Sequence, residues 1–505
     1  MLENLTSHSV SISKYGNQTL VFLASLIAIL PIFITDFPPC VDIPQHAAQI
    51  ALFKGTLNSS NPFANMFSIH WLTPYLTGYI IIIALNSIFN ITLAIKITIA
   101  FALFMIPWST SKLLETTQNT PLYALFTIPA IYGFSFNWGF LNFMVAAPLG
   151  ILFTSYMIQY SEEQNTKKAF MMSLLINLLF FCHALIWLYF SLISVLYILA
   201  STRNIHKTFL KSLPLLSSLP LAIFWLFHTV LKAQPSTGIA PTVYALGWWR
   251  INILPLIYGN NNTFTNTITI LATIALPLLY GAKFSRNMAR WSPLIITLLI
   301  ILLVPHTLLN VPFIYERFGV FVLPFFLITL NTDKSSIKYV NTFKFATLGI
   351  VFLYTLNEFI VMSGFKEETL DFKEILTSMR PGQRVISLMF SRNSSFSTAP
   401  VYLHFPLWYQ AERQGLVEYN FANGFMLLVQ YKHDSSPANI SGFEWNPQSF
   451  NWNTSQAIMY KYFLARAPID PGPFIFSDSG CKIFLKKNIG VWWLYERIIP
   501  TPSHC

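Results

Sequence analysis

Eleven apolar segments fill most of the first 361 residues and constrain the fold more than any other feature of the sequence. They cover residues 18–35, 74–90, 92–108, 121–134, 140–158, 169–200, 212–231, 266–281, 292–310, 317–331 and 345–361. A membrane-crossing helix needs about 20 residues, within a range of about 17–25, so the shorter segments must tilt or be extended by their neighbours. Charged residues make up only 10% of the chain, whereas soluble domains carry about 25%. The sequence therefore predicts a mainly α, polytopic transmembrane helical bundle of about 11 spans.

Clusters of lysine and arginine between the apolar segments predict the orientation of the bundle. The three clusters are Arg203, Lys207 and Lys211, then Lys283, Arg286 and Arg290, then Lys334, Lys338 and Lys344. Basic residues are retained in cytoplasmic loops. With a cytoplasmic N-terminus and 169–200 counted as one span, all three clusters lie inside. The 36–73 loop, the 232–265 loop and the C-terminal tail then lie outside. Counting 169–200 as two spans would reverse every later segment.

Most of the net charge of +11 lies in the apolar part of the chain, and this distribution argues against a nucleic-acid partner. Residues 1–361 hold 18 basic and 9 acidic side chains, whereas residues 362–505 hold 13 and 11. Positive charge concentrated in the loops of a membrane bundle has its usual explanation in cytoplasmic retention. The first segment lacks a strongly basic leader and a clear cleavage site, so we expect an uncleaved anchor. We therefore expect an integral, multi-pass protein of a bacterial inner membrane, surrounded by membrane lipids.

The sequence changes character after Val361 and predicts a second domain. Residues 362–505 contain 24 of the 51 charged side chains. RVISLMF at 384–390 predicts a buried strand, and residues 401–415 predict a helix closed by Gly415. Residues 473–478 predict a further strand, and 481–497 predict a hairpin that turns at 487–490. We expect a transmembrane domain, 1–361, with a long first outer loop at 36–73, and a soluble, extracytoplasmic α/β domain, 362–505.

Two acids and a histidine stand together in the first outer loop, in the run TDFPPCVDIPQHAAQIALF. If a helix begins at Pro44, His46 projects from its first turn, close to Asp42 just outside it. A carboxylate held there would act as a general base on an acceptor hydroxyl. The alternative is that Asp42 only caps the helix, but capping does not explain Asp36 and His46 as well. We predict Asp42, Asp36 and His46 as catalytic residues.

The run His70-Trp71-Leu72-Thr73-Pro74-Tyr75 stands at the mouth of the second apolar segment. His70 and Tyr75 are predicted to bind substrate by lining the same cavity as the acids. The alternative is an aromatic anchor at the membrane interface, where such rings are enriched.

Tyr315-Glu316-Arg317-Phe318 stands at the outer end of the tenth segment. An arginine at that depth is costly unless it is paired or binds an anion. A planar guanidinium suits phosphate, so Arg317 is predicted to hold a lipid phosphate while Glu316 orients it. The alternatives are snorkelling to the surface or a structural Glu–Arg pair.

Five other polar residues are weaker candidates. His183 and His306 more often satisfy helix–helix hydrogen bonds than bind ligands. His404, Glu412 and Arg413 share a predicted helix, where a solvated polar face is the favoured explanation.

Asp42 and His46 could contribute ligands to a divalent metal ion, although two residues do not make a site.

These residues resemble the GT-C superfamily of integral-membrane glycosyltransferases. The resemblance rests on Asp36, Asp42 and the D-I-P-Q-H run, on T-P-Y at 73–75 and on E-R-F at 316–318. The run G-V-W-W-L-Y-E-R at 490–497 resembles uncharacterised bacterial members of this architecture. Such proteins have many spans, an essential Asp in a long first outer loop and often a C-terminal outer domain.

The resemblance implies transfer, with inversion, of a sugar from a polyprenyl-phosphate donor to a glycan, lipid or protein acceptor at the outer face. It leaves open whether Asp36 or Asp42 is the base. No sequon-recognition motif is evident, so protein N-glycosylation is not favoured. A membrane transporter or lipid flippase would share the spans and the buried arginine, although such proteins often show repeated halves that this sequence lacks. A non-catalytic envelope assembly protein, in which the acids only cap helices, is the third possibility.

Overall fold

The computed structural model describes most of the chain and divides it into two compact units. It describes residues 16–231, 241–259, 262–309, 311–332, 340–424, 426–432, 435, 442–453, 457–480 and 482–498. The first unit, here the helical unit, comprises Met1–Ile32, Ile97–Phe136 and Asn142–Ile360. The second, here the α/β unit, comprises Phe33–Lys96, Asn137–Leu141 and Val361–Cys505. Most of the predicted first outer loop is thus grouped with the residues after Val361. The division of the chain into a domain at 1–361 and a domain at 362–505 stays a prediction.

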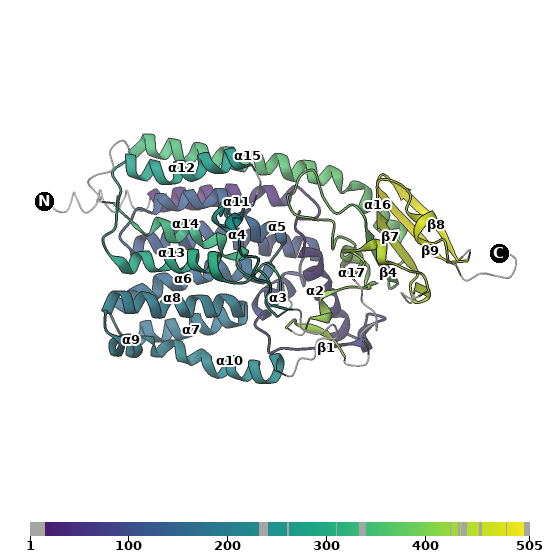
Figure 1. Ribbon diagram of the computed structural model, residues 1–505, viewed down its shortest axis with the longest axis horizontal. Coiled ribbons are helices and arrows are strands. Elements are labelled where there is room, and N and C mark those ends of the chain that lie inside the picture. The colour runs from purple at the N-terminus through teal and green to yellow at the C-terminus, as the bar shows by residue number, and fades with distance from the viewer. Residues whose placement is uncertain are drawn as a thin grey trace. The chain divides into compact units, whose positions relative to one another are not determined.

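The helical unit is built from long apolar helices that run roughly alongside one another (Figure 1). Among the described residues, six helices are long and apolar enough to cross a membrane: Gly16–Phe33, Ile91–Thr116 (α4), Leu141–Glu162 (α6), Ala184–Thr202 (α8), Ile205–Val230 (α9, α10 and intervening turns) and Val340–Ser378 (α15 and α16). Shorter helices complete the unit: Pro121–Ala130 (η3), Thr166–Cys182 (α7), Thr263–Leu279 (α12), Met288–Leu303 (α13) and Gly319–Leu327 (α14). The mainly α bundle predicted from the sequence is confirmed.

Many of these helices keep one apolar face outside the unit. Leu188 and Leu192 on α8 and Phe345 and Phe352 on α15 are each more than two-fifths exposed. Helices suit such surroundings because they satisfy their own backbone hydrogen bonds without water. Inside the unit, polar contacts join neighbouring helices, as where Thr269 of α12 meets the Tyr354 hydroxyl of α15 at 2.8 Å.

The structure breaks the 169–200 segment into two helices, while the number of times it crosses the membrane stays a prediction. The α7 helix ends at Cys182, α8 begins at Ala184, and His183 between them has an extended backbone with φ −169° and ψ 118°. The two helices pack against each other as a pair.

The 74–90 segment also differs from the prediction, because only Leu76–Leu85 (α3) is helical there. Ten residues extend about 15 Å, too short for a crossing.

The α/β unit contains a five-stranded sheet in the order β5-β4-β7-β9-β8. Its strands are Arg384–Met389 (β4), Leu416–Val417 (β5), Tyr462–Arg466 (β7), Ile483–Ile489 (β8) and Trp492–Arg497 (β9). β4 is parallel to β5 and β7, whereas β9 is antiparallel to β7 and β8. The inner positions of β4 and β7, such as Ile386 and Phe463, pack into a core with Phe450, Phe476 and Tyr495. A separate two-stranded ladder joins Phe67–Ile69 (β1) to Val429–Tyr431 (β6).

Predictions for the C-terminal residues were partly confirmed. The strand at 384–390 and the 481–497 hairpin are present as β4 and β8–β9. The predicted helix at 401–415 is shorter, Leu407–Arg413 (α17), and ends where Gln414 adopts φ +53°. The predicted strand at 473–478 is wrong, because Gly472–Ile475 (α18) is a helical turn. There the Gly472 N–H donates to the Asp470 carboxylate and to the Tyr495 hydroxyl, which favours a turn over a strand.

Candidate active site

Asp42 stands immediately before α2, Ile43–Leu57, whose Pro44 occupies the first turn as predicted. Its backbone is in the helical region, φ −92° and ψ −7°, and its side chain makes no capping hydrogen bond. Side-chain capping requires an extended backbone at this position, so the capping alternative does not explain the carboxylate. The Asp42 Oδ1 instead lies 3.6 Å from Nε2 of His404.

The backbone around Asp42 is held by a short segment, Asn137–Leu141, that belongs to the same unit. The N–H groups of Val41 and Asp42 donate to the carbonyls of Asn137 and Trp138 at 3.1 and 3.0 Å. Gly139 has φ +74°, and a Cβ there would lie 3.0 Å from the backbone nitrogens of Asp42 and Ile43. A glycine is therefore required for this close approach.

The hydrogen bonds around His404 determine which ring nitrogen carries its proton. The Phe421 N–H donates to Oε1 of Gln45 at 2.9 Å, so the amide NH₂ of Gln45 faces Nδ1 of His404, 3.3 Å away. Nδ1 is thus the acceptor, and the proton on Nε2 faces Asp42. Burial lowers the pKa of His404 to about 3, so the imidazole is neutral at physiological pH. The contact with Asp42 is therefore an N–H dipole facing a carboxylate, not an ion pair.

The side chain of His46 has a different neighbour from the one predicted. Its Nδ1 lies 2.8 Å from the Tyr79 hydroxyl of α3, and its ring packs edge-on against Phe421. The His46 N–H donates to the Asp42 carbonyl at 3.1 Å, which is the first helical hydrogen bond of α2. His46 and His404 both contact the Phe421 ring, so the three lie together behind the start of α2.

Asp36 lies in different surroundings from Asp42. Its side chain is 42% exposed, and Oδ2 is 2.9 Å from Nζ of Lys373. Asp36 lines an open cavity of about 810 Å³ together with Lys96 and Glu412. The structure thus separates the two acids into a half-exposed ion pair and a mostly buried carboxylate that faces a neutral imidazole.

His70 and Tyr75 lie in the loop between β1 and α3. Nε2 of His70 is 3.0 Å from the Ser68 hydroxyl, and the His70 N–H donates to the Leu428 carbonyl. The Tyr75 N–H donates to the hydroxyl of Thr73 at 3.2 Å. These contacts order the loop, and substrate binding by the two side chains stays a prediction.

Glu316 and Arg317 belong to the helical unit, in a buried turn, Glu316–Phe318, before α14. The guanidinium of Arg317 donates through Nε to the Phe313 carbonyl at 3.0 Å and through Nη2 to the Pro312 carbonyl at 3.1 Å. The carboxylate of Glu316 contacts Nδ1 of His306. Glu316 thus has a histidine partner that the sequence analysis did not pair with it.

Arg250 organises the same region and was missed by the sequence analysis. It is 3% exposed, and its guanidinium donates to five carbonyls: Tyr244, Ala245, Ile301, Leu302 and Val304. It also lies 3.8 Å from the centre of the Tyr315 ring. Arg250 thereby joins the C-terminal end of α13 to Tyr315, the residue before Glu316. The one available signal was an arginine beside two tryptophans in a predicted outer loop.

Two buried acids of the α/β unit were also missed. Glu418 follows β5, and its carboxylate accepts from the N–H and the hydroxyl of Ser387 at 2.9 Å each. Burial raises the pKa of Glu444 to about 7. Burial, together with the charge of Glu444, also holds the pKa of Glu418 well above its usual range. Only the fold brings these acids together, because they lie in irregular sequence between strands.

The comparisons with known proteins rest on structure alone. No protein-family model and no curated protein matches the sequence. A solved structure does match: ArnT from Cupriavidus metallidurans, crystallised with bound undecaprenyl phosphate. The TM-score is 0.53, and the match covers 95% of this chain and 98% of that one, at 10% sequence identity. The chain has the ArnT fold. At this identity the match shows the fold alone, and the mainly α transmembrane fold class predicted from the sequence is confirmed at that level.

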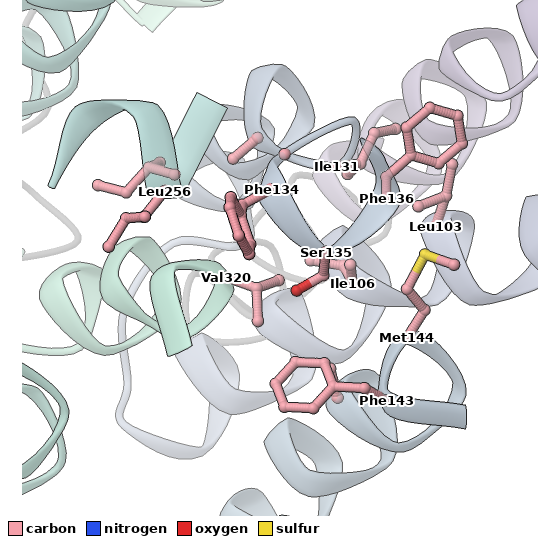
Figure 2. Close-up of a pocket in the computed structure, with 14 residues that line it drawn as sticks. Leu103, Ile106, Ile131, Phe134, Ser135, Phe136, Phe143, Met144, Leu256 and Val320 are labelled. Carbon is pink, nitrogen blue, oxygen red and sulfur yellow. The ribbon is translucent and has the colours of Figure 1, made fainter. Parts of the chain in front are cut away.

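The ArnT fold and the apolar helices make this chain an integral membrane protein. Within the helical unit, a small space of about 10 Å³ lies between Phe134, Phe143 and Val320. Figure 2 shows that its walls are almost wholly apolar, with the Ser135 hydroxyl as a polar exception. It holds about one water molecule at most, so it is not a ligand site.

The side chains that could bind a metal ion are not grouped around Asp42 and His46. Within the described ranges, no three His, Cys, Asp or Glu side chains are grouped so that they could hold a metal ion. The imidazole and carboxylate of His46 and Asp42 face different neighbours, Tyr79 and His404. Asp42 and His46 therefore do not share one metal ion in this arrangement.

Proposed function

We propose that this protein transfers a sugar from a polyprenyl-phosphate donor to an acceptor hydroxyl at the outer face of the membrane, with Asp42 as the general base. One observation carries the proposal: the Asp42 carboxylate is not used as a helix cap and faces the Nε2–H of a buried, neutral histidine. The ArnT fold adds that a protein of this architecture binds undecaprenyl phosphate.

The reaction requires one proton transfer and one displacement. The acceptor oxygen attacks the anomeric carbon while Asp42 takes its proton, and the bond from that carbon to the phosphate oxygen breaks. The bonding electrons leave on the phosphate, so polyprenyl phosphate departs as an anion. A positioned base contributes about 10²–10⁴-fold to such a rate. The His404 N–H faces the carboxylate and keeps it oriented for this step.

The other predicted residues keep the roles that the sequence suggested. Arg317 is proposed to bind the donor phosphate, with its guanidinium fixed at the start of α14 by the carbonyls of Phe313 and Pro312. His70 and Tyr75 are proposed to contact the substrate from the loop before α3. Asp36 is half-exposed and paired with Lys373, and this favours Asp42 over Asp36 as the base.

The orientation predicted from the charge pattern is compatible with the observed helices if every other apolar segment crosses the membrane. If α7 and α8 cross separately and α3 does not cross, the C-terminal residues remain on the outer side. The basic clusters at Arg203–Lys211 and Lys283–Arg290 then remain cytoplasmic, as retention of positive charge requires. We accordingly propose that Asp42 and residues 362–505 face the outside of a bacterial inner membrane.

The test is whether the protein breaks the donor bond or only moves the lipid. Purified full-length protein is reconstituted in vesicles with undecaprenyl-phosphate-linked hexose, and host membranes are supplied as the acceptor source. We expect release of undecaprenyl phosphate together with labelled hexose in the acceptor fraction. Movement of the donor lipid between leaflets without bond cleavage would refute the enzyme and favour a flippase. Absence of both activities would favour an assembly protein.

A further inference from the structure

A polar cavity in the α/β unit is not used by the proposed chemistry. Its volume is about 810 Å³, within the range of about 300–1,000 Å³ found for small-molecule sites. Its charged lining consists of Asp36, Lys54, Lys96, Lys373 and Glu412. These side chains come from the first outer loop, α2, the start of α4, α16 (Leu370–Ser378) and α17.

Positive charge predominates in this cavity. Asp36 and Lys373 neutralise each other at 2.9 Å. Glu412 is the other acid in the lining, and the Thr92 hydroxyl donates to it at 3.2 Å. Burial raises the pKa of Glu412 and lowers that of Lys96. The two remaining cations are Lys54 and Lys96, so the cavity favours an anionic ligand.

Neutral oxygens hold both of these lysines in place. Nζ of Lys54 donates to the side-chain oxygen of Asn86 at 3.0 Å and to its carbonyl at 3.3 Å. Nζ of Lys96 donates to the Thr35 carbonyl at 3.0 Å, and the residue is only 9% exposed. Hydrogen bonds to neutral oxygens position an ammonium group without cancelling its charge, which is an arrangement suited to phosphate.

The rest of the polar lining suits a saccharide. Amide and hydroxyl side chains surround the lysines: Asn58, Ser60, Asn86, Asn90, Thr92 and Gln414. Such groups both donate and accept hydrogen bonds, as sugar hydroxyls do. The apolar part of the lining includes Phe37, Ile91 and Leu93.

Part of the cavity lining comes from the start of a membrane-length helix, α4. Lys96 lies five residues beyond Ile91, the first residue of the membrane-length helix α4, and so about 7.5 Å along its axis. A ligand in the cavity can thus come from a lipid headgroup or from solution.

We propose that this cavity binds a phosphorylated saccharide, with Lys54 and Lys96 on the phosphate and the amide and hydroxyl side chains on the sugar. The proposal goes beyond the proposed transfer reaction, because binding requires neither Asp42 nor bond cleavage. A failure of the transfer experiment would therefore leave the binding experiment unaffected.

The test compares glucose 1-phosphate with glucose for binding to the purified full-length protein in neutral detergent, by isothermal titration calorimetry. We expect glucose 1-phosphate to bind at least tenfold more tightly, and its affinity to fall as salt rises. Lys54→Gln and Lys96→Gln should each weaken it by about fivefold to tenfold, since each removes one charged contact. The matched control is Lys487→Gln, a lysine that pairs with Glu374 outside the cavity and should leave binding unchanged.

The same titration in lipid nanodiscs identifies the source of the ligand. If bilayer headgroups occupy the cavity, phosphatidylglycerol nanodiscs should weaken glucose 1-phosphate binding relative to phosphatidylcholine nanodiscs, and Lys54→Gln should abolish that difference. If the ligand is soluble, the two lipids should give equal affinities, and the anion site stands in either case. Equal binding of glucose and glucose 1-phosphate, or unchanged affinity in both lysine variants, would overturn the proposal. Lys54 keeps the test valid if the buried Lys96 variant fails to fold.

Discussion

The Asp42 carboxylate lies 3.6 Å from Nε2 of His404, and Gln45 fixes the tautomer that directs the Nε2 proton toward it. The two residues come from opposite ends of the chain. The arrangement gives the proposed base an orienting N–H donor that stays neutral. A protonated histidine would compete with the acceptor for the negative charge of Asp42.

His404 is therefore a positioning residue whose effect falls on turnover. We expect His404→Ala to lower kcat by about tenfold to hundredfold with little change in KM, because the carboxylate loses its orienting N–H. His404→Gln, whose side-chain amide can place an N–H near the position of Nε2, should recover part of the loss. Steady-state kinetics on both variants checks this. Equal losses in both, or a loss confined to KM, would assign His404 to packing.

The low pKa of His404 also predicts a pH dependence of stability. The neutral imidazole is retained in the fold down to about pH 3, whereas in the unfolded chain it takes up a proton near pH 6.5. Between those values the unfolded state binds the extra proton, so the stability that His404 contributes is lost as the pH falls. The slope is about 1.4 kcal/mol per pH unit. Melting temperatures in detergent between pH 4 and pH 7.5 should therefore fall more steeply for the native protein than for His404→Gln. Parallel curves would contradict the assignment.

Arg250 is predicted to be essential for the fold of the helical unit. Arg250→Ala leaves five carbonyls without their donor, and each buried group left unpaired costs about 1–3 kcal/mol. We expect a destabilisation of roughly 3 kcal/mol or more, seen as a lower melting temperature. The control is Arg286→Ala, because Arg286 is exposed in the turn between α12 and α13. Similar melting temperatures for the two variants would show that the Arg250 contacts contribute little.

The break at His183 makes a topological prediction. If α7 and α8 each cross the membrane, the turn before α7 and the turn after α8 lie on the same side. Cysteines introduced at the exposed Gln164 and His206 should then react with a membrane-impermeant thiol reagent from the same side of sealed vesicles. The unsubstituted protein, in which Cys40 and Cys182 are buried, gives the background labelling. Labelling from opposite sides would restore a single span.

The sequence predicted those features of the fold that depend on residues close together in the chain. Pro44 after Asp42 marked the start of α2, and the apolar lengths indicated the bundle. Local pattern could not reveal the partner of Asp42, because His404 is brought to it by packing between distant segments. Nor did it find the break in 169–200, because the charge pattern favoured a single span and nothing local in that apolar run marks His183 as the end of a helix.

The predicted strand at 473–478 failed for a different reason. Its apolar residues fit a short strand, but Gly472 is held in a turn by Asp470 and Tyr495. The strand that pairs with β4 and β9 is instead β7, Tyr462–Arg466. A short apolar run does not by itself distinguish a buried strand from a helical turn.

Replacement of Asp42 tests the central claim most directly. Asp42→Asn keeps the shape of the side chain but removes its basicity, and Asp478→Asn makes the same change at an exposed acid of the α/β unit. Both variants are measured for transfer of hexose from undecaprenyl-phosphate hexose, at matched amounts of inserted, folded protein. We expect Asp42→Asn to lower the rate by at least a hundredfold and Asp478→Asn to leave it unchanged. Equal rates in the two variants would contradict the assignment of Asp42 as the base.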